Sequence, residues 1–123
     1  MSDKMKIKWR AKPEDHDYPA AASYLSLLYG EPAVARYIKR LRRVPLSKFE
    51  AKDIFRASRV SLLGIGNSHV EQERKRVVAG KPLSPLLLVR TASNDAVIIA
   101  DGYHRLCAVY SFDQDAVIPC KIV

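Results

Sequence analysis

The sequence has no long run of apolar residues and few cysteines. No stretch of its 123 residues approaches the roughly 18 consecutive apolar residues that a membrane-spanning helix needs. Residues 1–10 are charged and lack the apolar core of a secretion signal. The two cysteines, Cys107 and Cys120, form no metal-binding pattern and are expected to be buried, reduced thiols. These absences predict a cytoplasmic protein that does not cross a membrane.

Acidic residues are scarce as well. The chain has 13 Asp and Glu residues and 21 Lys and Arg residues, which gives a net charge of +8. Between Arg36 and Arg59, nine basic residues and only two acidic ones, Glu50 and Asp53, give a local net charge of +7. Such a segment fits a nucleic-acid interface, a solvated face or the lining of a site for a phosphorylated small molecule. The residues expected to contact DNA in the first case are Lys39, Arg40, Arg42 and Arg43.

The length of the chain and its 48% apolar content predict one domain with a compact core. Residues 1–17 are polar and are expected to form a loose arm, with at most a short strand around Ile7 and Trp9. Within this arm, His16 lies between Asp15 and Asp17. That arrangement suggests a metal ligand set, but a solvated loop explains it better, and no metal site is predicted.

Residues 18–43 are expected to form an αα-hairpin that packs on the rest of the domain. The first helix is predicted over residues 18–29, with Gly30 as its stop. The second helix begins at Pro32 and runs to about Arg42. Each helix has one apolar face: Ala21, Ala22, Leu25, Leu28 and Tyr29 in the first, and Val34, Tyr37, Ile38 and Leu41 in the second.

The remaining pattern, over residues 44–123, predicts an α+β domain with a small mixed sheet. Pro45 makes the first strand, over residues 44–49, an edge strand. Ser68 and Glu71 match a helix capping box, and Gly80 ends that helix. The other expected elements are a short helix at 51–57, an apolar loop at 61–67, two hairpin strands at 85–90 and 96–100, and a last strand at 116–123.

Residues 101–105 read as a strand end, a glycine turn and the start of a helix. Gly102 permits the tight turn, and Leu106, Val109 and Tyr110 follow at helical spacing. His104 and Arg105 then lie in the first helical turn, where unpaired N–H groups and the helix dipole favour an anion. The segment therefore predicts a phosphate site.

Two motifs resemble the ParB/sulfiredoxin superfamily. Residues 101–108, Asp-Gly-Tyr-His-Arg-Leu-Cys-Ala, resemble its G-x-H-R-x-x-A box, and residues 80–89 resemble its G-x-x-x-P-I-x-V strand. The resemblance covers residues 44–123 and implies a ParB/sulfiredoxin-like fold whose box binds nucleotide phosphates together with Mg²⁺. The expected phosphate-binding residues are Gly102, Tyr103, His104 and Arg105, with His69 as a second imidazole or a plain surface histidine.

The family contains several activities, and this sequence departs from two of them. Sulfiredoxins need a cysteine where Tyr103 stands, so repair of oxidised peroxiredoxin is not expected. ParB partition proteins add a helix-turn-helix and a dimerisation segment, which are not expected in a chain that ends at Val123. Small-molecule kinases of the family have a glutamate just beyond the first strand, where Glu50 stands, and that glutamate acts as a general base.

Two functional hypotheses remain open at the level of sequence. The first is a nucleotide-dependent phosphotransferase or nucleotide hydrolase, with Glu50, Asp101 and His104 as catalytic residues. The second is a non-enzymatic DNA-binding or nuclease-like module that uses the basic segment between Arg36 and Arg59. The sequence names neither the nucleotide nor an acceptor.

Overall fold

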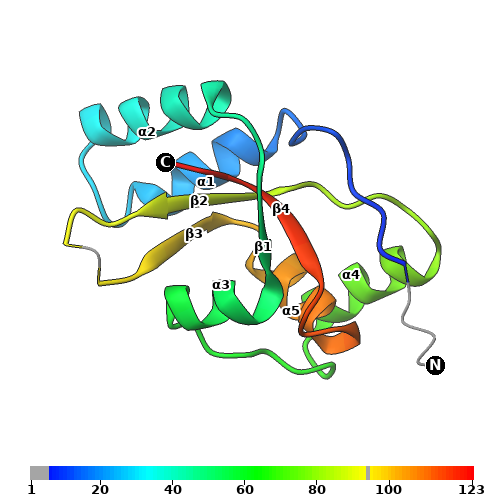
Figure 1. The fold of residues 1–123 in the computed structure, drawn as a ribbon. Helices are drawn as coiled ribbons and strands as arrows, with labels where there is room; N and C mark the ends of the chain where they lie inside the picture. The colour runs from blue at the N-terminus through cyan, green and yellow to red at the C-terminus, as the bar shows by residue number, and fades with distance from the viewer. Residues whose placement is uncertain (1–5, 94) are drawn as a thin grey trace.

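The computed structural model describes residues 6–93 and 95–123, and a four-stranded mixed sheet lies at its centre (Figure 1). The strand order is β1–β4–β2–β3, so β1 and β3 are the two edges. β2 and β4 are parallel, and the other neighbouring pairs are antiparallel. The strands are β1 (Ser47–Glu50), β2 (Leu86–Arg90), β3 (Val97–Asp101) and β4 (Val117–Ile122). The predictions of a small mixed sheet and of an edge position for the first strand are confirmed, but this strand spans Ser47–Glu50 instead of residues 44–49, so Glu50 is its last residue.

Helices cover both faces of the sheet (Figure 1). α1 (Asp17–Leu25) and α2 (Glu31–Arg43) contact each other and lie on one face. α3 (Ala51–Ser58), α4 (Ser68–Val78) and α5 (Tyr103–Phe112) lie on the other side. The described residues thus form an α+β fold of five helices and a four-stranded sheet.

Strand β2 explains why both faces are covered. Its first four residues are all buried, and successive side chains of a strand point to opposite faces. Leu86 and Leu88 pack into the core with α3 and α5, whereas Leu87 and Val89 pack into the core with α1 and α2. A strand that is apolar on both faces is stable only between two layers, so its sequence requires the second layer that α1 and α2 supply.

The first helix is shorter than its sequence pattern predicts. α1 ends at Leu25, and the next residues form tighter i→i−3 hydrogen bonds from the N–H groups of Leu27 and Leu28. Gly30 is the N-cap of α2 and not the stop of α1. As a result Leu28, expected on the buried face, is half exposed.

Helix α4 has a different cap from the one predicted. The side chain of Asn67 accepts hydrogen bonds from the N–H groups of His69 and Val70, so Asn67 is the N-cap and the Ser68–Glu71 capping box is wrong. The expected stop at Gly80 is confirmed, since Gly80 has a positive φ of 74°. Its N–H bonds to the Val77 carbonyl, and that of Lys81 bonds to the Arg76 carbonyl, which is the Schellman pattern.

The N-terminal segment is not loose where the structure describes it. Trp9 forms a parallel bridge with Leu83, and both Ile7 and Trp9 pack against the main core. The predicted short strand is therefore reduced to one bridge, and residues 1–5 of the predicted arm lie outside the described residues. Cys107 and Cys120 are free and buried, as expected. Within residues 6–93 and 95–123, no helix has the length and apolar character needed to cross a membrane.

Candidate functional site

A cleft of about 990 Å³ runs along the outer edge of β3. Its floor is the edge strand itself together with the start of α5, and its walls come from two segments on opposite sides of the sheet. One wall is the end of α1 and the turn after it; the other is the chain that follows α3. The lining consists of Tyr24, Leu28, Tyr29, Thr91, residues 58–61 and residues 96–104.

The first turn of α5 opens onto this cleft. Gly102 is the N-cap with φ 111°, and no side chain caps the helix. The first hydrogen bond of the helix joins the Leu106 N–H to the Gly102 carbonyl. The N–H groups of residues 103–105 therefore precede the hydrogen-bonded ladder, where a helix favours an anion. The predicted glycine turn and helix start are confirmed.

His69 and His104 meet beside this turn. Their ring centroids lie 4.9 Å apart, with 39° between the planes. Farther along the same two helices, Arg74 of α4 donates to Ser111 and stacks over Phe112 near the end of α5. The two helices therefore run side by side in the same direction, and the positive ends of both helix dipoles lie next to each other, although His69 itself does not line the cleft.

The surroundings of His104 lower its pKa. Burial is the largest cause, and the charge of His69 acts in the same direction, while the Glu73 carboxylate partly opposes them. His104 is therefore a neutral imidazole at pH 7, able to donate from one ring nitrogen and accept at the other.

Tyr103 contacts the second wall of the cleft, and Arg59 is part of that wall. The Tyr103 hydroxyl donates to the Ser61 carbonyl, which fixes the chain after α3 against α5. Burial raises the pKa of Tyr103, so the phenol remains protonated and keeps this bond. Arg59 is exposed in the left-handed backbone region (φ 58°) and brings a cation to the cleft. The sequence pattern did not single out Arg59 as a site residue.

Arg105 does not line the cleft. Its Nη2 atom lies 2.9 Å from the Asp101 Oδ2 atom, and both side chains are largely buried. A Cβ atom on Gly102 would lie 2.7 Å from Leu86 Cγ and 2.9 Å from Arg105 Nη2. The space on the Cβ side of Gly102 is therefore filled by the protein's own side chains, and Gly102 itself remains part of the cleft lining.

Asp101, at the end of β3, is the carboxylate that borders the cleft. Burial raises its pKa, and the neighbouring Arg105 guanidinium partly offsets that rise. The ion pair holds the strand end and the first turn of α5 together. In this position Arg105 orients Asp101 and supports the turn.

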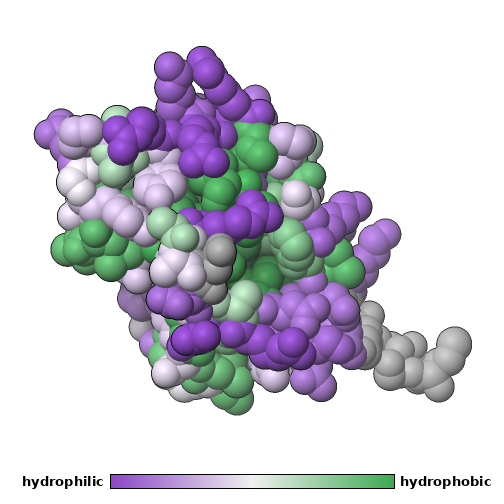
Figure 2. All heavy atoms as spheres, turned by 60° about the vertical axis from the view of Figure 1, so that its left-hand side comes forward, coloured by the Kyte–Doolittle hydropathy of each residue, from purple (hydrophilic) through white to green (hydrophobic). Residues whose placement is uncertain are grey.

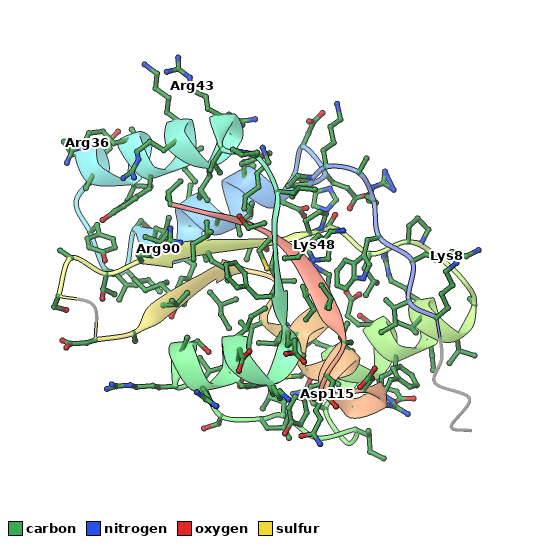
Figure 3. The ribbon with its side chains drawn as sticks, viewed as in Figure 1. Lys8, Arg36, Arg43, Lys48, Arg90 and Asp115 are labelled. Carbon is green, nitrogen blue, oxygen red and sulfur yellow. The ribbon has the colours of Figure 1, made fainter. Side chains whose placement is uncertain are left out.

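Glu50 lies apart from these residues. It is the last residue of β1, the opposite edge of the sheet, and does not line the cleft. Its carboxylate is 3.8 Å from Lys52, whose Nζ atom is 2.7 Å from Asp115. Figure 3 shows Asp115 at the end of the molecule opposite α2. The structure thus places Asp101 and His104 in the cleft lining and His69 beside His104, whereas Glu50 lies apart from them.

The basic segment does not form a single face. α2 lies on one side of the sheet and α3 on the other, so the charges between Arg36 and Arg59 divide between two surfaces. Figure 2 shows hydrophilic side chains gathered at the top of the molecule, where α2 lies, and Figure 3 shows Arg36 and Arg43 pointing away from the sheet. Lys39, Arg40, Arg42 and Arg43 are exposed there.

Arg42 also has a structural role within this group. Its guanidinium stacks 4.2 Å above the centre of the Tyr18 ring, and its carbonyl accepts a hydrogen bond from Lys121. It therefore joins α2 to α1 and to β4 in addition to presenting its charge.

His16 has different partners from those its sequence neighbours suggested. Its Nε2 atom lies 3.2 Å from Glu14 and 3.3 Å from Asp17, while Asp15 takes no part. Asp17 is buried and also accepts a hydrogen bond from the Glu14 N–H. These contacts join Glu14, His16 and Asp17 into one cluster at the start of α1.

Comparisons of the chain with protein-family models, with curated proteins and with solved structures found no match.

Proposed function

We propose that the cleft binds a nucleotide, with its phosphates at the start of α5. The observation that carries the proposal is the uncapped first turn of α5, which opens onto the cleft beside the paired imidazoles of His69 and His104. Backbone N–H groups and a helix dipole favour a phosphate at such a place, and histidine donors add to it.

Each residue of the site then has a separate role. The N–H groups of Tyr103 and His104 donate to phosphate oxygens, and the imidazoles of His104 and His69 donate from the side. Arg59 contributes positive charge from the opposite wall. Arg105 is a positioning residue that acts through Asp101. Asp101 is the acidic residue of the lining and would be the carboxylate able to hold a Mg²⁺ that accompanies the phosphates.

The order of elements after residue 44 agrees with the ParB/sulfiredoxin resemblance, which also favours nucleotide phosphates. We infer that residues 44–123 form a domain of that type and that α1 and α2 are an addition to it. If bound nucleotide is hydrolysed or transferred, Asp101 and His104 are the cleft residues able to move a proton.

Calorimetry with ATP, ADP and CTP, each with and without Mg²⁺, tests the proposal. Binding is expected in the wild type and is expected to weaken roughly tenfold or more in His104→Ala, since one charge-assisted or neutral donor is lost. A matched control is Glu50→Gln, which changes a carboxylate outside the cleft and is expected to bind normally. A folded wild type that binds neither a nucleotide nor inorganic phosphate would refute the proposal.

Turnover is measured on the same variants by phosphate release. If the site is catalytic, Asp101→Asn is expected to lose activity and Glu50→Gln to keep it. A role of Glu50 as the general base requires the reverse result. If nucleotide binds but no phosphate is released, the protein is a nucleotide-binding module without catalytic activity.

A second candidate function is DNA binding by α2. The observation in its favour is that Lys39, Arg40, Arg42 and Arg43 are all exposed on one helix. This surface requires no contribution from the cleft, so the two functions are separable by mutation.

A further inference from the structure

We propose that Tyr24 and Leu28 bind the flat ring of the ligand and so make the cleft selective for nucleotides over simple phosphates. This inference rests on the proposed function, because it concerns the other end of the same ligand. The ring of the ligand would then be recognised by α1 and the turn after it, which lie outside the residues that resemble the family motifs.

Tyr24 and Leu28 are exposed at the cleft although both are large apolar side chains. Their exposed fractions are 46% and 50%. Tyr24 lies in the last turn of α1 and Leu28 in the turn that follows, and both side chains line the cleft. Adjacent exposed apolar side chains that line a concave surface are typical of a ligand-binding wall.

The wall has a fixed support. Leu25, between the two residues, is fully buried in the core formed with β2 and α2. Tyr29 lines the cleft next to them, and its ring lies 5.2 Å from that of Tyr37 of α2, centre to centre. α2 therefore supports the backbone of this wall through Leu25 and Tyr29.

The cleft differs in character between its two ends. The end at Gly102 and His104 offers N–H donors and an imidazole, whereas the end at Tyr24, Leu28 and Ile98 is apolar and aromatic. A ligand that satisfies both ends carries an anion and a flat, weakly polar ring, which is the chemistry of a nucleotide. The volume of about 990 Å³ lies within the range of small-molecule sites, roughly 300–1,000 Å³.

The test compares ligands that share a phosphate group but differ in the ring. Affinities for ADP, CDP, ribose 5-phosphate and inorganic pyrophosphate are measured by calorimetry on the wild type. ADP and CDP are expected to bind at least tenfold more tightly than the two ligands without a base, since stacking of one base on an aromatic side chain has about that effect.

The variants are Tyr24→Ala, Leu28→Ala and Tyr24→Phe. The first two are expected to lose most of the preference for ADP while pyrophosphate binding is unchanged, and Tyr24→Phe, which keeps the ring, is expected to retain it. Leu27→Ala is the matched control, because Leu27 is 80% exposed and does not line the cleft. Circular dichroism confirms that each variant is folded.

The outcomes separate this inference from the proposed function. If pyrophosphate binds but ADP binds no more tightly, the wall has no role and the inference is wrong, while the phosphate site stands. If Leu27→Ala lowers ADP affinity as much as Leu28→Ala does, the inference is wrong as well. If no ligand binds, both proposals fail together.

Discussion

The imidazole rings of His69 and His104 lie 4.9 Å apart, each in the first turn of its own helix. Two groups that both become cationic on protonation are thus held together at the positive ends of two helices. Burial and the neighbouring charge of His69 lower the pKa of His104, and a bound phosphate would oppose that lowering. Binding of an anion and uptake of a proton are therefore expected to be coupled.

This coupling predicts how the pKa of His104 responds to mutation. Because the charge of His69 lowers the pKa of His104, His69→Gln is expected to raise it toward 6.5. Inorganic phosphate is expected to raise it further. NMR titration of the imidazole protons measures both shifts. A His104 pKa that does not change in His69→Gln would contradict the coupling.

Gly102 is expected to be intolerant of any side chain. Its φ of 111° is unfavourable for other residues, and an added Cβ would lie 2.7 Å from Leu86 Cγ. Gly102→Ala is expected to lower the free energy of unfolding by about 2 kcal/mol or more. Gly64→Ala and Gly66→Ala are matched controls, because a Cβ at either position meets no atom within 4 Å. Equal stability of Gly102→Ala and these controls in urea unfolding would contradict the packing described.

Arg105 is expected to contribute more to the fold than to direct phosphate binding. Arg105→Ala leaves the largely buried Asp101 carboxylate without its partner, which is expected to cost about 1–3 kcal/mol and to raise the pKa of Asp101 further. The double variant Asp101→Asn/Arg105→Ala removes the buried charge and is expected to recover part of that stability. If Arg105→Ala binds phosphate more weakly but is as stable as the wild type, the guanidinium instead contacts the ligand directly.

The two buried thiols are expected to make the free energy of unfolding fall at alkaline pH. Burial raises the pKa of the Cys120 thiol to about 12, and burial also raises that of Cys107. An unfolded thiol ionises near pH 8.5, so the folded state keeps a proton that the unfolded chain loses. Stability is then expected to fall between about pH 9 and pH 12, by about 1.4 kcal/mol per pH unit for one such group.

Cys120→Ala isolates this effect, because the variant lacks the thiol but keeps the other groups that titrate in alkali. Its unfolding free energy is expected to fall less steeply with pH than that of the wild type. In addition, a thiol reagent at pH 7 is expected to modify neither cysteine in the folded protein and both after denaturation. Rapid modification of the native protein would show that these thiols are accessible.

DNA binding by α2 is tested with Lys39→Ala/Arg40→Ala/Arg43→Ala. Arg42 is kept because it stacks on Tyr18 and its removal would disturb the packing of α1 on α2. If α2 binds the phosphate backbone, affinity is expected to fall, and the slope of its salt dependence to become shallower by about one unit for each phosphate no longer neutralised. Arg56→Ala/Lys75→Ala/Arg76→Ala removes equal charge elsewhere and is expected to have less effect. No binding at low salt would exclude this function.

The local elements of the site are encoded by residues that are neighbours in the sequence. The apolar strand before Asp101, the glycine turn and the helical spacing from Leu106 each follow from such neighbours, and the structure has all three. The stop of α4 at Gly80 and the edge position of β1 after Pro45 are local as well. Local rules failed at two helix ends: α1 stops early in a tighter turn, and Asn67 caps α4 in place of Ser68.

Which side chains meet at the site depends instead on long-range packing. His69 and His104 become neighbours because α4 and α5 pack side by side, and Glu50 is removed from the cleft because β1 and β3 are opposite edges of the sheet. The basic segment is divided because its two helices cover opposite faces. The spacing of apolar residues along the chain determines which face of a helix or strand is buried. Which other element packs against that face depends on strand order and helix packing, and these involve residues far apart in the sequence.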